Sequence, residues 1–394
     1  MYSRRRTDLA RMFICLSAFA LATSGIVRIE PAPYDFLVGA LLLLGLAANL
    51  LRFSRNLLLP ALLILVFLVS NMVPILNMQE GFEGAVRAIL IRVYLVMSWL
   101  LFVGVLWAYG RQGFQFIWLG YLVAAITSSL LGTLGALGLP FFREYFVLFD
   151  YRAVGFFKDP NVFAPFLVPA ALYTVYRWYT AIGRRKRILW ISSLGILMTG
   201  ILLALSRAAW LNVGVVLLIF LFIPGVVRFR DRIRAMSWLG AFALIFVIFV
   251  MNNPTLASRI GDRLGLKAYD QDRFGTQAAA LYMSLDNPLG IGPGQAEVVL
   301  EYATHSLYMR VLVENGWMGF VAFMLLVIVS LWRSVTNSLR GTLWSRWMYA
   351  LVAASLFGIL FNSFFIDSLH WRHLWVLLAL AWGPYEAIVS HHPR

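Results

Sequence analysis

The stretch that decides the fold class is Leu57–Leu76, LLLPALLILVFLVSNMVPIL, which contains no charged residue. A transmembrane helix needs about 20 consecutive apolar residues to cross the hydrocarbon core of a bilayer. Another long apolar run is Leu239–Met251, and short charged clusters separate such runs along the chain. The pattern predicts an all-α, polytopic membrane protein and differs from the alternating pattern of an outer-membrane barrel.

The overall composition points the same way. Hydrophobic residues make up 61% of the 394 residues and charged residues only 13%, which is more apolar side chain than a soluble protein can bury. We expect a single membrane domain over residues 1–394 with about 12 transmembrane helices. Their predicted centres lie near residues 20, 43, 66, 97, 125, 170, 196, 216, 244, 319, 355 and 380.

The distribution of charge predicts an orientation. The formal net charge of +15 is spread over short segments between spans, with no compact basic domain, so nucleic acid is not an expected partner. Arginine-rich clusters at Arg4–Arg6, Arg184–Arg187 and Arg228–Arg234 fall on one side. By the positive-inside rule this side is cytoplasmic and holds both termini. The acidic residues expected on it are Asp8, Asp231 and Glu386.

Three loops are expected on the opposite, outer side. They are Gly138–Pro160, Asn252–Thr304 and Phe365–His373. The longest, residues 252–304 between the ninth and tenth helices, is expected to be partly helical up to about Leu285. Long loops within compact domains are often functional, so we expect the chemistry on this side.

Two arginines near the outer ends of spans are candidate functional residues. Arg207 lies in a break between two apolar runs that is too short for a loop. An arginine there either snorkels to lipid headgroups or meets an anion. Arg92 is expected roughly 9 Å inside the outer end of the fourth span, which requires a polar cavity or an anionic partner.

The glycine-rich run Asn287–Gly294 in the long loop resembles a phosphate loop when read alone. No strand precedes it and no Lys-Ser/Thr pair follows, so this match is weak. Turn-forming Gly and Pro residues at the end of a helix account for it better.

His305 begins a predicted membrane helix, and a neutral imidazole can accept a proton from a hydroxyl. By itself, a histidine at a helix start is more often a cap or a surface residue. Glu314 lies about 180° round the helix from it, so Glu314 is expected to pair with an arginine or a backbone group. Arg152 precedes the segment Asp159–Asn161, which predicts another helix start.

Metal and cofactor sites are not expected. His370 and His373 are three residues apart, but only Asp367 lies nearby as a third ligand. The sequence contains no catalytic-triad order, nucleophile elbow or HExxH motif.

Four separated motifs resemble, in order and spacing, the superfamily of O-antigen ligases and O-antigen polymerases, which are bacterial envelope membrane proteins. The His-to-Glu-Asn-Gly segment is the most specific of them. The motifs are Arg152–Asn161, Ser206-Arg207, Asp272-Arg273-Phe274 with Asn287–Gly292, and His305–Tyr308 with Glu314-Asn315-Gly316.

The resemblance implies a metal-independent, inverting glycosyltransferase of the bacterial inner membrane with its active site at the periplasmic face. It would move a glycan from undecaprenyl diphosphate to an acceptor hydroxyl, on lipid A-core for a ligase or on a lipid-linked glycan for a polymerase. Arg207 and Arg273 match the family arginines assigned to the lipid diphosphate. His305 matches the histidine assigned to activation of the acceptor, and Arg152, Arg92 and Glu314 are accessory candidates.

Two alternatives stay open. A ligase and a polymerase need the same leaving-group chemistry, so these motifs do not separate them. The rival from another class is a polysaccharide or small-molecule transporter or flippase, which should place ionisable groups near the middle of the bilayer.

Overall fold

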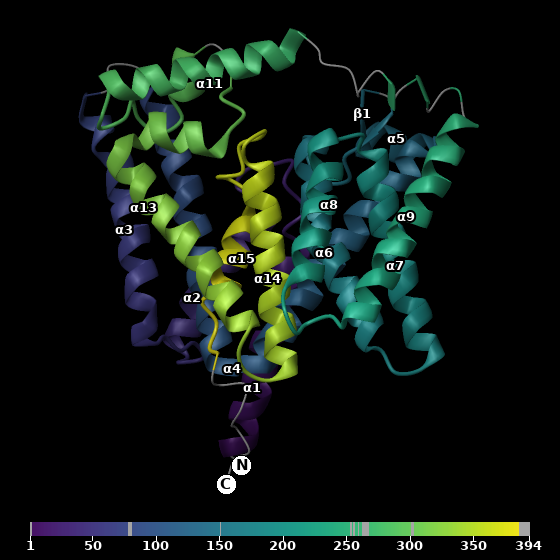
Figure 1. Cartoon of the computed structure of the whole chain (residues 1–394). Coiled ribbons are helices and arrows are strands. Elements are labelled where there is room, and N and C mark those ends of the chain that lie inside the picture. The colour runs from purple at the N-terminus through teal and green to yellow at the C-terminus, as the bar shows by residue number, and fades with distance from the viewer. Residues whose placement is uncertain are drawn as a thin grey trace.

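The computed structural model describes residues 2–77, 81–149, 151–252, 268–300 and 303–385, with a few positions between 254 and 261. The cytoplasmic tail expected after Tyr385 and much of the first half of the expected outer loop lie outside these residues. The described chain is a bundle of long helices, with α11 (Ala268–Asp286) lying across one end of it (Figure 1). The fold is all-α apart from one two-residue β-ladder.

The other elements follow in chain order. The helices before the long loop are α1 (Tyr2–Ala22), α2 (Pro33–Ala47), α3 (Leu58–Met72), α4 (Phe82–Ala136), α5 (Pro140–Phe146), α6 (Pro160–Thr180), α7 (Arg184–Leu203), α8 (Arg207–Phe222) and α9 (Phe229–Met251). Those in and after it are α11, α12 (Ala296–Val299), α13 (Leu307–Ser338), α14 (Leu343–Asn362) and α15 (Arg372–Ala381). Short 3₁₀ turns cover Arg55–Leu57 and Pro74–Asn77, and β1 (Val147–Leu148) pairs antiparallel with β2 (Arg152–Ala153).

Five helical segments among the described residues are long and apolar enough to cross a membrane, which identifies a helical membrane protein. They are Arg55–Leu76, Phe82–Ala136, Arg184–Leu203, Leu307–Ser338 and Leu343–Asn362. Three further apolar helices, α2, α8 and α15, have 10–17 residues. These three are shorter than the 20 residues expected of a span, and the total of about 12 spans stays a prediction.

Helix α4 shows why two predicted spans appear as one element. A straight helix of 55 residues would be about 80 Å long, far more than the roughly 30 Å of a bilayer core. The chain instead turns back at Gly110, which has φ +52° and ψ −123°. A Cβ placed on Gly113 would lie 3.1 Å from the carbonyl oxygen of Val105, so the two halves pack side by side.

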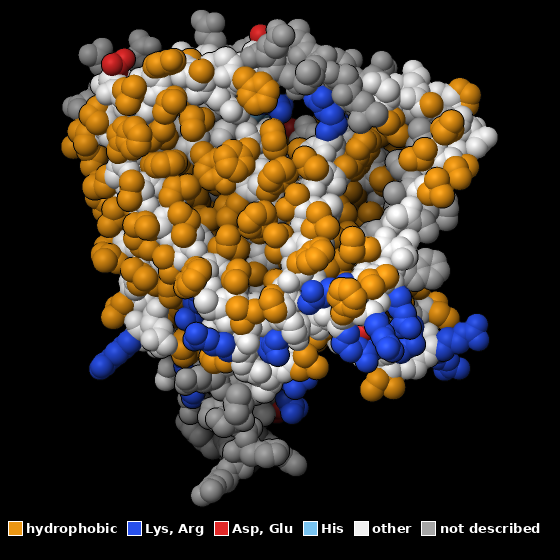
Figure 2. All heavy atoms as spheres, in the orientation of Figure 1, with side chains coloured by type: hydrophobic (Ala, Val, Ile, Leu, Met, Phe, Trp, Pro, Cys, Tyr) orange, Lys and Arg blue, Asp and Glu red, His pale blue; other side chains and the backbone are white. Residues whose placement is uncertain are grey.

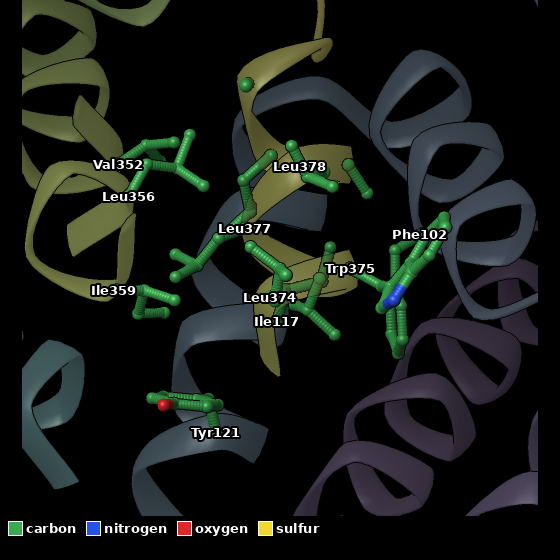
Figure 3. Packing of buried hydrophobic residues seen from close by; sticks show 14 of the residues in the cluster. Phe102, Ile117, Tyr121, Val352, Leu356, Ile359, Leu374, Trp375, Leu377 and Leu378 are labelled. Carbon is green, nitrogen blue, oxygen red and sulfur yellow. The ribbon is translucent and has the colours of Figure 1, made fainter. Parts of the chain in front are cut away.

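The centre of the bundle is the short helix α15, which is buried along its entire length. A helix that is apolar all round must be enclosed by others. Leu374 and Trp375 of α15 lie beside Ile117 and Phe102 of α4, and Leu377 points toward Leu356 of α14 (Figure 3). Because α15 follows the loop at 363–371 directly, this packing fixes where that loop emerges.

The described surface combines an apolar belt with a basic end. Figure 2 shows hydrophobic side chains over the middle of the molecule and Lys and Arg side chains gathered at the end where the N-terminus lies. We call this the basic end. The opposite end, where α11 and residues 287–300 and 303–306 lie, is called the loop end.

Candidate functional site

Arg152 of β2 organises the break between α7 and α8. Its Nε donates to the carbonyl oxygen of Ala204 at 2.9 Å, and its Nη2 donates to that of Leu205 at 3.2 Å. The same Nη2 lies 3.1 Å from Oδ1 of Asn161. These carbonyls have no helical partner because α7 ends at Leu203. The buried guanidinium therefore satisfies a helix end and holds the chain that leads into α8.

Arg207 is the first residue of α8, as its position in a short break predicted. Its side chain is half-buried. Leu205, two residues before it, has φ +50°, a left-handed conformation that is uncommon for a branched residue. The carbonyl bonds from Arg152 hold this backbone in place and so determine where Arg207 emerges.

The helix start predicted at residues 159–161 is confirmed. Asp159 caps α6, because its Oδ1 accepts a hydrogen bond from the backbone N–H of Asn161 at 2.7 Å, and Pro160 is the first helical residue. Asn161 in turn contacts Arg152. The segment from Arg152 to Asn161 therefore joins α6 to the break before α8.

The glycine-rich run packs against a break in α13. The backbone N–H groups of Ile291 and Gly292 donate to the carbonyls of Val313 and Glu314 at 2.9 and 3.1 Å. The N–H of Trp317 donates back to Pro288 at 3.0 Å. These N–H groups are occupied by α13, so the interpretation as a turn is confirmed and a phosphate loop does not form here.

Two glycines make this backbone packing possible. Gly290 has φ +90°, and a Cβ on it would lie 2.5 Å from the carbonyl oxygen of Glu314. Gly316 has φ +65° and ψ −174°, a region essentially restricted to glycine. The motifs Asn287–Gly292 and Glu314–Gly316, which are separated in the sequence, thus form one structural unit.

Arg92 and Glu314 meet inside this unit. Both side chains are fully buried, and Nη2 of Arg92 donates to Oε2 of Glu314. Arg310, one turn before Glu314, donates from Nε to its Oε1 at 3.2 Å. The expectations that Arg92 has an anionic partner and that Glu314 pairs with an arginine are both confirmed.

The network extends from Arg310 to two more carboxylates. Its Nη1 lies 2.6 Å from Oδ2 of Asp367, in the loop before α15, and 3.2 Å from Oε1 of Glu297 in α12. Burial acts to raise the pKa of Asp367, but Arg310 and then His370 oppose it and hold that pKa below its ordinary value. Burial followed by repulsion from Arg310 lowers the pKa of His370 to about 3. His370 is therefore neutral near pH 7.

His305 lies at the edge of this network. It is half-buried and precedes the N-cap Ser306 of α13, with φ +46°. Burial, followed by the positive charge of Arg273, lowers the pKa of its imidazole, and Asp159, Glu297 and Asp367 oppose this shift. The charges that influence the protonation of His305 therefore come from α11, from the residue before α6, from α12 and from the loop at 363–371.

Arg273 is carried by α11, which packs on α13. The helix begins at Ala268, earlier than expected, so Asp272 and Arg273 are helical residues and do not precede a helix. Arg273 is half-buried, whereas Phe274 beside it is 55% exposed. The side chain of Arg273 is therefore turned toward the protein, and its positive charge contributes to the lowered pKa of His305.

The candidate residues consequently form three groups. Arg92 and Glu314 belong to the buried charge network, whereas Arg273 and His305 interact at its edge. Arg207 follows the backbone that Arg152 holds.

Sequence reasoning missed Arg310, the residue with the most carboxylate partners in the network. Its spacing of four residues from Glu314 is the usual one for an ion pair on a helix and could have identified it. The spacing of Asp367 and His370 suggests only a metal site, and their place beside Arg310 has no local signal in the sequence. The described residues bring together no group of three His, Cys, Asp or Glu side chains that could hold a metal ion.

The loop expected at residues 365–373 lies two residues earlier, at 363–371. Arg372 and His373 begin α15 and are buried. Nε and Nη2 of Arg372 donate to the two carboxylate oxygens of Asp35 at 2.9 and 2.6 Å, which joins α15 to the first turn of α2. His373 packs among Tyr121, Phe166 and Trp371. Both residues are therefore structural.

Comparison with protein-family models finds no match for this chain. Comparison with curated proteins likewise finds no similar sequence.

Proposed function

We propose that this protein is a metal-independent, inverting glycosyltransferase of the bacterial inner membrane that resembles O-antigen ligases. In this proposal it transfers a glycan from undecaprenyl diphosphate to an acceptor hydroxyl in the synthesis of lipopolysaccharide or another surface polysaccharide. The loop end faces the periplasm, and both chain termini are cytoplasmic.

The observation that carries the proposal is the placement of His305, which is half-buried just before α13 at the loop end, where Arg273 is also half-buried on α11, the helix that packs on α13. A general base must be unprotonated at the working pH and must lie beside the group that it serves. Burial and the charge of Arg273 both lower the pKa of His305, so the imidazole is neutral near pH 7. The left-handed backbone at His305 is of a kind that is enriched at functional sites.

The proposed reaction needs few further groups. The acceptor oxygen forms a bond to the anomeric carbon while the bond from that carbon to the diphosphate oxygen breaks. The bonding electrons stay on the diphosphate, and the proton of the acceptor hydroxyl passes to a ring nitrogen of His305. Guanidinium groups of Arg207 and Arg273 offer forked donors to the phosphate oxygens and stabilise the developing charge. Attack opposite the leaving group inverts the anomeric centre.

The surrounding structure supports these roles by holding the backbone of each group. Arg152 binds the carbonyls that precede Arg207. The helix that follows His305 is held at its start, because the N–H of Leu307 donates to the carbonyl of Ser363 at 3.0 Å. Rigid placement matters because the donor and the acceptor must meet within reacting distance.

A polymerase would use the same groups with a lipid-linked glycan as acceptor, and it remains the alternative within this class. A transporter or flippase is supported less well. The deepest ionisable side chains, Arg92 and Glu314, are fully buried and bind each other, so they are structural partners and do not line a path through the bilayer.

The decisive experiment is reconstitution of the purified protein with an undecaprenyl diphosphate-linked glycan and one acceptor at a time. Lipid A-core and a second lipid-linked glycan are the two acceptors, and the products are separated by mass. Glycosylated lipid A-core indicates a ligase, and an extended lipid-linked chain indicates a polymerase. Absence of a new glycosidic bond with either acceptor contradicts the proposed reaction.

Matched variants separate chemistry from folding. His305→Ala should abolish transfer while leaving the protein inserted and folded, and full activity in this variant would refute the base role. Arg207→Ala and Arg273→Ala should each reduce transfer strongly. Arg87→Ala is the control, because Arg87 also lies at the loop end but is 67% exposed and has only a 3.9 Å contact with Glu30. It should retain activity.

A further inference from the structure

A groove at the basic end of the molecule combines two arginines with an apolar wall. It lies at the turn between α6 and α7, has a volume of about 430 Å³ and is open to the surface. Its lining residues are Trp178, Gly183, Arg184, Arg187, Ile188 and Ile191. It lies at the end of the bundle opposite α11 and the candidate site, and it plays no part in the proposed reaction.

The four lining residues from α7 share one face of the helix. Arg184, Arg187, Ile188 and Ile191 follow the spacing i, i+3, i+4, i+7, which places side chains in a single stripe. The stripe is basic at the start of the helix and apolar about 10 Å further along. Its apolar part is exposed, with Ile188 at 51% and Ile191 at 49%.

The arginines of this stripe are not neutralised by the protein. Within the described part of the chain, no carboxylate forms an ion pair with Arg184 or Arg187. The basic cluster at the start of α9 differs from this stripe, because Asp231 forms ion pairs there with Arg228 and Arg234. Two adjacent guanidinium groups without a carboxylate suit a phosphate group, which they can bind through several hydrogen bonds.

The apolar wall indicates which phosphate compound fits. Helix α7 is a candidate membrane span of which only 22% of the apolar window is buried inside the protein. Ile188 and Ile191 therefore continue into the lipid-facing surface. Trp178 stands beside them, and tryptophan favours the boundary between headgroups and hydrocarbon. A ligand that satisfies the whole groove needs an anionic head and a hydrocarbon tail.

We propose that this groove binds one anionic phospholipid, with its phosphate between Arg184 and Arg187 and an acyl chain along Ile188 and Ile191. The bound lipid fixes the turn between α6 and α7 at the membrane surface.

The test uses the full chain and native mass spectrometry with added phosphatidylglycerol, and phosphatidylcholine serves as the uncharged comparison. The double variant Arg184→Ala/Arg187→Ala should weaken phosphatidylglycerol binding about thirtyfold, since a basic residue near an anionic surface contributes about 1 kcal/mol. The control Arg185→Ala/Lys186→Ala removes the same charge from the other faces of the same turn. It should change binding less than about threefold.

Other outcomes would overturn the proposal. Equal losses in both double variants mean diffuse attraction by the basic end, and no loss in the first variant means that the groove is not used. Ile188→Ser/Ile191→Ser should also weaken binding, and inorganic phosphate in excess should not displace the lipid. If phosphate displaces it, the ligand is a free anion. Thermal unfolding checks that all variants fold, which is expected because the substituted side chains are exposed.

Discussion

Arg92 of α4 and Glu314 of α13 form an ion pair between two fully buried side chains that lie 222 positions apart in the sequence. Glu314 has a second partner in Arg310. Among the described residues, the hydrogen bonds of Arg92 go to Glu314 alone, and its Nε and Nη1 have no partner. The two members of the pair are therefore not equivalent, and this difference can be measured.

Glu314→Gln should destabilise the protein more than Arg92→Met does. The first substitution leaves a buried guanidinium without its carboxylate, which typically costs about 3–5 kcal/mol. The second leaves Glu314 still bound to Arg310 at 3.2 Å, so its cost should be clearly smaller. Thermal or denaturant unfolding of the purified protein in detergent gives the ranking. The reverse order would mean that Arg310 alone does not stabilise the buried charge of Glu314.

Features at the ends of α6 and α8 could be predicted from the sequence, whereas contacts between distant helices could not. The break before Arg207 and the helix start at Asp159 are local features, set by short runs and by capping, and both were predicted correctly. The partner of Arg92 could be inferred only as an anion, because a contact across 222 positions leaves no local pattern. The length of a short buried helix such as α15 is also not set by the bilayer rule of about 20 residues, since protein surrounds this helix on every side.

The close packing at Gly290 predicts that a Gly→Ala substitution there has a different effect on stability from the same substitution at Gly275. Gly290→Ala should destabilise the protein by about 2–4 kcal/mol, because a Cβ meets the carbonyl of Glu314 and the backbone has a positive φ. Gly275→Ala in α11 is the control. A Cβ there meets nothing within 4 Å, so this variant should be unchanged or more stable by about 0.5–1 kcal/mol. Unfolding in detergent distinguishes them, and equal stability of the two variants would contradict the proposed packing.

Arg152 should not be replaceable by lysine. Its guanidinium makes three hydrogen bonds in different directions, to Ala204, Leu205 and Asn161, and an ammonium group lacks this fork. We expect Arg152→Lys to lower the free energy of unfolding by about 2–3 kcal/mol, since each hydrogen bond to a charged group contributes about 1.5–3 kcal/mol. Asn161→Ala removes only one of these bonds and should cost less. If lysine preserves the unfolding temperature, Arg152 does not hold the break before Arg207.

The pH dependence of transfer tests the electrostatic link between His305 and Arg273 and rests on the proposed function. The pKa of His305 lies below its usual 6.5, first because of burial and then because of Arg273. The neutral base should therefore persist below pH 6.5, and activity should fall only as the pH drops through the lowered pKa. Arg273→Gln removes a positive charge that disfavours the imidazolium, so the pKa of His305 should rise. The acid limb of the pH profile should then move to higher pH. A rate that falls without any displacement of this limb would show that Arg273 binds substrate without acting on His305.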